Sequence, residues 1–364
     1  MNIDKKTVYS AAVTSFLFSY LVHHPILRHH IYSDIVAFWN RGFLPFLQVP
    51  YLEAEFEYPP LAGFIAYVSA FGRNITAYYT IFSLIIFASY LVLLELVMRI
   101  ASEKGVGLEY VLVFLVLSPS IVLYSVYNFD MIFAALLIAS LYLFSRGNLR
   151  ASATVFSVAA LIKLVNLIFL PFILMEIRSW RERIRYAVIA VGIFAVVNLS
   201  LWALNPKFID ETYLYHARWG LEDAWFIAFF PDRSSWDTAK LFSMLLMGYG
   251  LLKVYLCDFE DVYQRMFMGV AVFLLTTYVF TPQMLLWILP FLAIFGKIPI
   301  PYFGLELANS AILLTWFETS NPTKFGSLPQ NFAILRAILL FMILLESYFW
   351  FRRSIQVVPS SQSA

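Results

Sequence analysis

The leading candidate for acid–base chemistry in this chain is Asp34. It stands in the run Ile31-Tyr32-Ser33-Asp34-Ile35, where a single carboxylate lies among apolar neighbours. Partial desolvation raises the pKa of such a carboxyl toward the range of a general base. The alternative is structural, because Ser33 or Asp34 could cap a short helix that runs to Trp39.

Three basic side chains have the chemistry of a phosphate site. Lys163 is the single charge between two apolar half-spans, and His216 and Arg218 lie within the aromatic and acidic run 213–226. Arginine grips phosphate through its planar fork, and histidine adds a hydrogen bond or a proton. Lys163 could instead snorkel to the membrane interface without a ligand. An interfacial aromatic belt would explain the Tyr and Trp residues, but not His216 and Arg218 together.

Two acidic residues, Glu57 and Asp130, are candidates for substrate binding: Glu57 for sugar hydroxyls, and Asp130 because its carboxylate lies close to the depth of the membrane. Glu57 ends the acidic strip 53–57, in which Glu53 and Glu55 are better explained as solvated surface. Asp130 stands between two apolar spans in a hairpin of a few residues, so its carboxylate should be paired or face a cavity. A turn that merely caps the next helix is the alternative.

The chain carries little sign of metal or nucleic-acid binding. The pairs His23-His24 and His29-His30 lack a convincing ligand spacing, and the single cysteine, Cys257, excludes a thiol cluster. We therefore expect no metal or other cofactor, with a divalent ion as the less favoured alternative. A net charge of +2 without any basic run gives no reason to expect a nucleic-acid partner.

The elements that must position these residues are transmembrane helices. The chain is 61% hydrophobic and 13% charged, far from the roughly 25% charged residues of a soluble domain. This composition predicts an all-α integral membrane protein of about twelve transmembrane helices, with residues 1–358 as one domain and 359–364 as a short cytoplasmic tail. The expected spans are 8–22, 77–98, 108–126, 129–145, 151–162, 164–176, 186–204, 239–256, 264–280, 284–295, 299–317 and 331–351. The first of them follows Lys5-Lys6 like a signal peptide, but no small-residue cleavage site comes after it, so we expect it to stay as an uncleaved span.

The orientation depends on the apolar segment Leu61–Phe71, which is too short to cross and follows a diproline. If this helix lies flat on the outer face, the clusters of Lys and Arg all fall on the side of the N-terminus, as the positive-inside rule requires. Both termini are then cytoplasmic. Large outer loops follow at about His23–Thr76 and Asn205–Asp237, with shorter outer connections at Tyr127–Asp130, Lys163, 281–283 and 318–331.

The order of these motifs resembles the GT-C superfamily of membrane glycosyltransferases, and within it the polyprenol-phosphate-mannose-dependent mannosyltransferases and the GPI mannosyltransferase I group. Tyr32-Ser33-Asp34 and Tyr58-Pro59-Pro60-Leu61 match an acid followed by a Tyr-(Pro/Thr)-Pro-Leu element in the first outer loop. The turn that follows Ser118-Pro119 and ends in Asn128-Phe129-Asp130, then Lys163, the cluster of Tyr215, His216 and Arg218, and the run 280–287 are similar to the later landmarks. The first loop has one acid where the GPI enzymes have Asp-x-Asp.

The resemblance implies an inverting transferase and assigns roles to the residues. A hexose, with mannose favoured, would pass from a polyprenyl- or dolichyl-phosphate donor to a glycan or glycolipid acceptor on the outer or lumenal face of a prokaryotic plasma membrane or of the endoplasmic reticulum. Asp34 would be the catalytic base. The donor phosphate would be held by Lys163, His216 and Arg218, and the substrates would be oriented by Glu57, Tyr58, Asp130, Glu222 and Gln283.

Two other classes of protein fit parts of the sequence. A secondary transporter or lipid flippase would also have a dozen spans with sparse charges, such as Glu306 and Glu346, but no internal repeat is visible. A non-catalytic subunit that keeps the glycosyltransferase fold is the third hypothesis, and it predicts that Asp34 is dispensable.

Overall fold

The computed structural model describes residues 3–357, with side chains to residue 353, so the expected tail 359–364 lies outside the described residues. Within this range the chain is helical and has no β-strand, only isolated bridges at Pro50–Ala54 and Glu222–Val279. The helices are α1 (Lys5–Val22), α2 (Asp34–Asn40), α3 (Pro60–Ala70), α4 (Ile75–Glu103), α5 (Leu108–Leu115), α6 (Pro119–Tyr124), α7 (Asp130–Ser145), α8 (Leu149–Ala160), α9 (Leu170–Glu176), α10 (Trp180–Leu204), α11 (Tyr215–Ala217), α12 (Trp236–Leu256), α13 (Val262–Thr276), α14 (Leu289–Phe295), α15 (Tyr302–Trp316) and α16 (Leu328–Val357). The short 3-10 helices are η1 (Leu44–Phe46), η2 (Leu164–Phe169), η4 (Trp225–Ala228), η5 (Arg233–Ser235) and η6 (Pro282–Trp287), and η3 (Asp210–Leu214) is a π-helix.

Four helices of the described chain are long and apolar enough to cross a membrane: Ile75–Glu103, Trp180–Leu204, Arg233–Leu256 and Leu328–Arg353. Helical segments also occur within each of the other spans expected from the sequence, but most are shorter. The all-helical, membrane-embedded class is therefore supported, while a total of about twelve crossings stays a prediction.

Prolines explain why several of the expected spans are broken. Pro119 starts α6 after a break behind α5, and Pro171 and Pro290 each stand in the first turn of α9 and α14, directly after the 3-10 turns η2 and η6. Proline lacks a backbone N–H and collides with the preceding turn, but it fits the first turn of a new helix.

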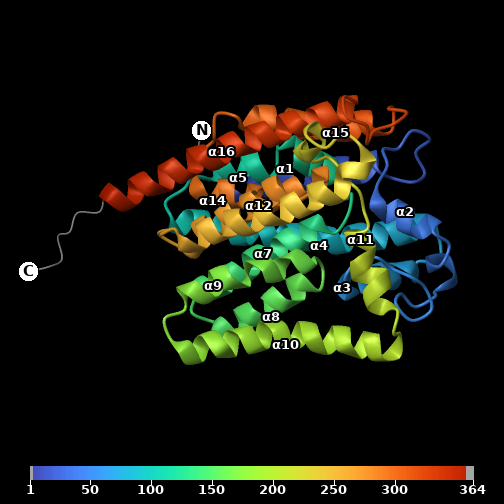
Figure 1. The fold of residues 1–364 in the computed structure, drawn as a ribbon, viewed down its shortest axis with the longest axis horizontal. Helices are drawn as coiled ribbons and strands as arrows, with labels where there is room; N and C mark the ends of the chain where they lie inside the picture. The colour runs from blue at the N-terminus through green and yellow to red at the C-terminus, as the bar shows by residue number, and fades with distance from the viewer. Residues whose placement is uncertain (1–2, 358–364) are drawn as a thin grey trace, which may run out of the picture.

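The helices lie roughly parallel to the long axis of the molecule (Figure 1). Helix α10 forms one edge, α15 and α16 form the opposite edge, and α4 and α7 lie between them. The short helices α2 and α11 gather at one end, whereas α16 ends at the other. Helix α3 begins at Pro60, as the sequence predicts, and packs against α4.

Ion pairs join the helices at the end away from α2 and α11. Lys104, just after α4, pairs with Asp261 before α13, and Arg146 after α7 pairs with Glu103. Arg265 and Glu176 form a further pair at the start of α13 and the end of α9. These ion pairs fix the short connections at this end of the bundle to one another.

Candidate active site

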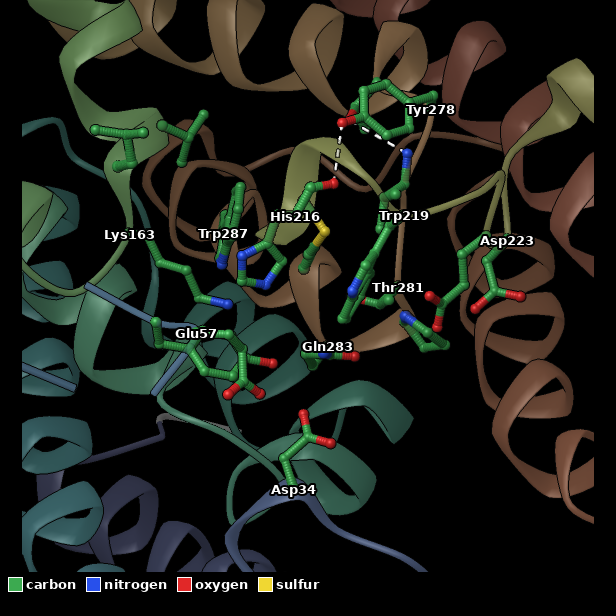
Figure 2. A pocket seen from close by; sticks show the side chains of 18 of the residues that line it. Asp34, Glu57, Lys163, His216, Trp219, Asp223, Tyr278, Thr281, Gln283 and Trp287 are labelled. Carbon is green, nitrogen blue, oxygen red and sulfur yellow. Dashed lines mark hydrogen bonds between the residues drawn. The ribbon is translucent and has the colours of Figure 1, made fainter. Parts of the chain in front are cut away.

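A cavity of about 560 Å³ opens at the end of the bundle where α2 and α11 gather. Its wall receives residues from connections that are far apart in the sequence, and Figure 2 shows their side chains around one common space. The polar lining residues are Tyr32, Asp34, Glu57, Tyr58, Tyr127, Lys163, Thr212, Tyr213, His216, Trp219, Glu222, Asp223, Thr277, Tyr278, Thr281, Gln283, Trp287 and Trp316.

Asp34 lines this cavity at the start of α2. The Ser33 hydroxyl caps the helix by accepting a hydrogen bond from the Val36 N–H at 3.4 Å, so the Asp34 carboxylate is not needed as the cap. It accepts a hydrogen bond of 2.7 Å from Asn128 Nδ2 instead. The structural and the functional interpretations of this run therefore apply to different residues, Ser33 and Asp34.

The surroundings of Asp34 change its acid strength. Burial raises the pKa of the Asp34 carboxyl to about 6, and the negative charge of Asp130 adds to this effect. The Tyr32 hydroxyl, the Lys163 ammonium and the Asn128 amide act in the opposite direction, because they favour the charged form. A carboxyl with this pKa is a competent general base at neutral pH.

Lys163 reaches the cavity from the turn between α8 and η2. Its ammonium lies 3.3 Å from Asp130 Oδ1, and the same oxygen accepts a hydrogen bond of 2.8 Å from Trp287 Nε1. The ammonium also faces the rings of Tyr58 and Trp287, at 5.5 and 5.9 Å from their centroids. The Lys163 side chain is 15% exposed, so the pair with Asp130 holds it in place while part of it remains accessible from the cavity.

Asp130 is completely buried at the first position of α7 and does not line the cavity. The sequence predicts that Asp130 is either paired or faces a cavity, and the structure shows that it is paired, with Lys163. Lys163 and Trp287 both contact Asp130 Oδ1, whereas Oδ2 has no hydrogen-bond partner among the described residues, so the expected contact of Asp130 with substrate stays a prediction. Through Oδ1, Asp130 positions Lys163.

Glu57 and Tyr58 both line the cavity, ahead of α3. Glu57 is buried and forms an ion pair with Arg41, a residue that has no functional signal in the sequence. The Tyr58 ring lies 5.3 Å from the His216 ring. Glu53 and Glu55 are exposed, as expected of solvated residues.

His216 lines the cavity, but its sequence neighbour Arg218 does not. Burial lowers the pKa of the His216 imidazole, and Lys163 lowers it further, which favours the neutral ring. Arg218 is exposed and pairs with Asp210. The structure therefore does not place it where the sequence predicts, at the donor phosphate. Successive residues of a helical turn point about 100° apart, so side chains two positions apart face nearly opposite ways.

Glu222 lines the cavity together with Asp223, which the sequence did not single out. Burial raises the pKa of both carboxyls, and Asp34 adds to the rise for Glu222. Gln283 is 5% exposed and lines the same space, and its Oε1 has no hydrogen-bond partner among the described residues. These side chains provide acceptors for hydroxyl or ammonium groups of a ligand.

The described residues contain no cluster of three or more His, Cys, Asp or Glu side chains placed to hold a metal ion. His23 is buried, and its two ring nitrogens bond the carbonyls of Ile31 and Leu123 at 3.0 and 2.7 Å. This ring therefore has no free nitrogen for a ligand. The absence of a cofactor stays an expectation from the sequence.

Comparisons with known proteins agree on a membrane glycosyltransferase fold. A family model described as glycosyltransferase family 87 matches residues 56–296. The apo crystal structure of ArnT from Cupriavidus metallidurans aligns with a TM-score of 0.51 at 15% identity, covering 95% of this chain and 77% of that chain. The structure of ArnT bound to undecaprenyl phosphate aligns with a TM-score of 0.49 at 16% identity, covering 97% of this chain and 79% of that chain. The apo alignment shows a shared fold, as the resemblance to the GT-C superfamily predicts.

Proposed function

Because the chain belongs to glycosyltransferase family 87, we propose that it transfers a hexose, preferably mannose, from a polyprenyl- or dolichyl-phosphate donor to a glycan or glycolipid acceptor. The observation that carries this proposal is one cavity that holds both a carboxylate with the pKa of a base, Asp34, and an anchored ammonium, Lys163. A transferase of this kind needs both groups, since one hydroxyl is activated while one phosphate leaves.

The side of the cavity near Lys163 suits a lipid phosphate. Leu164 and Ile168 line the cavity next to this lysine and are 42% and 40% exposed. An apolar exposed surface beside a cation matches a molecule that joins a prenyl chain to a phosphate anion. His216 lies on the same part of the wall in Figure 2 and supplies a further hydrogen bond to the phosphate.

The opposite part of the cavity suits sugar hydroxyls. Asp223 and Gln283 provide carboxylate and amide acceptors, and Trp219 provides an aromatic face for a sugar ring (Figure 2). Glu222, the neighbour of Asp223 in the chain, lines the cavity as well and adds a second carboxylate. Glu57 and Tyr58 also line the cavity, and Glu57 lies beside Lys163 in Figure 2. Among the described residues that line the cavity, the part of the wall with Asp223 and Gln283 carries no cationic side chain, so it favours a polyhydroxyl substrate.

In the proposed reaction Asp34 accepts the proton of an acceptor hydroxyl. The oxygen attacks the anomeric carbon in line, and the bond from that carbon to the phosphate oxygen breaks, which inverts the configuration. The electron pair leaves with the polyprenyl phosphate, whose negative charge Lys163 and His216 stabilise. Arg218 has no part in this scheme because it pairs with Asp210 outside the cavity.

The test is sugar transfer by purified protein in lipid vesicles, with a panel of radiolabelled polyprenyl-phosphate hexoses and a lipid extract as acceptor. Asp34→Asn is expected to lower transfer by about 10²–10⁴-fold, the usual contribution of general base catalysis. Asp210→Asn is the matched control, since it removes an exposed carboxylate of the second outer loop, and it should transfer at the wild-type rate. Full activity of Asp34→Asn would remove Asp34 as the base, and no transfer from any donor would favour a transporter or a non-catalytic subunit.

A further inference from the structure

Arg336 is a completely buried arginine in the third turn of α16. Its Nη2 donates a hydrogen bond of 2.8 Å to the carbonyl of Asp223 and another to the carbonyl of Phe280. Its guanidinium also lies 3.7 Å from the centroid of the Phe280 ring. One side chain thus holds the second outer loop and the segment before η6, which both line the cavity.

Asn309 of α15 extends this connection to a third segment. Its Oδ1 accepts a hydrogen bond of 2.8 Å from Arg336 Nη1. Its Nδ2 donates to the carbonyl of Pro282 at 3.0 Å and to Ser120 Oγ at 3.1 Å. The helix that begins at Pro119 leads directly into the turn that carries Asn128, the partner of Asp34.

The segment that Arg336 holds has a fixed but unfavourable backbone. Asp223 adopts φ 49°, a left-handed conformation that side chains with a Cβ rarely take. Glu222 is locked beside it, because its N–H bonds the Tyr278 carbonyl at 3.2 Å and its carbonyl accepts the Phe280 N–H at 3.0 Å. The direction of the two carboxylates therefore depends on contacts from outside their own loop.

A charge buried within a membrane span is costly, and such residues are retained mainly where they have a function. Ionised residues are usually paired when buried, but the guanidinium of Arg336 is met here by carbonyls, an amide and an aromatic ring. The carboxyl of Asp223 lies close enough for this arginine to oppose the rise of its pKa, a rise that burial causes. These contacts of Arg336 with Asp223, Phe280 and Asn309, here called the clamp, join segments of the cavity wall and are not an ion pair between helices.

We propose that Arg336, through Asn309, is a positioning residue that fixes the Glu222–Asp223 and 280–283 walls of the cavity and thereby sets its affinity for the sugar. This inference rests on the proposed function. It assigns to α15 and α16, which lie at one edge of the molecule in Figure 1, a role in substrate recognition. Arg336 does not itself line the cavity.

The chain offers a matched control in Arg265, which is 6% exposed. Its Nη1 donates to the carbonyls of Val254, Tyr255 and Cys257 at 3.3, 3.3 and 2.9 Å, and its Nε donates to Glu176 at 2.7 Å. It resembles Arg336 in burial and in bonding to carbonyls, but it holds the end of α12 and does not line the cavity. Replacement of either arginine by lysine keeps the charge and removes the planar fork.

The experiment compares Arg336→Lys, Arg265→Lys and wild type in steady-state transfer at varied donor and acceptor. Arg336→Lys is expected to raise the KM of at least one sugar substrate by about tenfold or more, with a smaller change in kcat, because the groups that bind the sugar are no longer held in place. Arg265→Lys should reduce thermal stability without changing KM. If Arg336→Lys does not fold, Asn309→Ala should raise KM in the same direction and by a smaller factor.

Amide hydrogen exchange of the reconstituted variants gives a readout that does not depend on activity. Arg336→Lys should speed exchange of the N–H groups of Glu222 and Phe280, whereas Arg265→Lys should leave both at the wild-type rate. Wild-type KM together with wild-type exchange in Arg336→Lys would overturn the inference. If wild type itself transfers no sugar but the exchange result holds, the proposed function fails while the clamp is retained.

Discussion

The acid strength of Asp34 results from opposing contacts at the scale of single residues. Burial and Asp130 raise the pKa of its carboxyl to about 6, while Tyr32, Lys163 and Asn128 limit the rise. Only the ionised carboxylate accepts a proton, so the free enzyme should be inactive well below this pKa and fully active above it. We expect kcat/KM to rise tenfold per pH unit below about 6 and to be level above it, as measured by transfer in vesicles between pH 4.5 and 8.

The contribution of Lys163 to this profile has a definite sign. Its positive charge favours the ionised form of Asp34, so Lys163→Met should move the midpoint to higher pH as well as weaken donor binding. Lys207→Met, which removes an exposed lysine of the second outer loop, is the control and should keep the wild-type midpoint. A midpoint near 4 in wild type would show that the pKa of the Asp34 carboxyl is not raised above its ordinary value.

At the scale of elements, the start of α3 is fixed by the buried Tyr51. The Tyr51 hydroxyl lies 2.9 Å from the carbonyls of Tyr58 and Pro59 and accepts the Gly63 N–H at 3.0 Å. Tyr58 and Pro59 line the cavity, so this contact sets one wall of the site. A Cβ on Gly63 would lie 2.2 Å from the Tyr51 hydroxyl, which must then move.

Gly63→Ala is therefore expected to destabilise the protein by about 1–3 kcal/mol, the usual cost of overpacking, and to reduce transfer. Gly192→Ala is the control on α10, where a Cβ meets nothing within 4 Å. That change should be neutral or stabilise by about 0.5–1 kcal/mol, because glycine weakens helix interiors. Thermal unfolding in detergent measures both, and equal behaviour of the two variants would contradict the role of Tyr51.

The elements also show what the sequence could predict. Apolar length and proline located most helices, including α3 to within a residue at each end, because both signals are local. The lining positions of Asp34 and Lys163 followed from isolated charges at helix ends. Arg218 was misplaced because helical geometry turns it away from His216, and Arg41 and Asp223 depend on tertiary contacts. Arg336 did have a local signal, a lone charge inside an apolar span, that the sequence analysis did not use.

At the scale of the whole molecule, the cavity is lined by connections that are far apart in the sequence, and this shows which connections lie at the same end of the bundle. Asp34, Tyr127, Lys163, His216 and Gln283 come from connections that the charge pattern places on a single side. When consecutive helices run antiparallel, every second connection lies at the same end of the bundle. The structure therefore places the connections at one end of the molecule, and the face of the membrane to which that end belongs stays a prediction.

Cysteine labelling in intact cells tests that orientation. After Cys257→Ser, single cysteines replace the exposed residues Ser320, in the connection before α16, and Ser102, near the end of α4. The positive-inside rule predicts that a membrane-impermeant maleimide labels Ser320→Cys in intact cells and Ser102→Cys only after permeabilisation. The reverse pattern would place the cavity in the cytoplasm, where the donor would have to be presented from the inner leaflet. Labelling of both positions in intact cells would mean that the number of crossings between α4 and α16 is even, whereas the expected spans require an odd number.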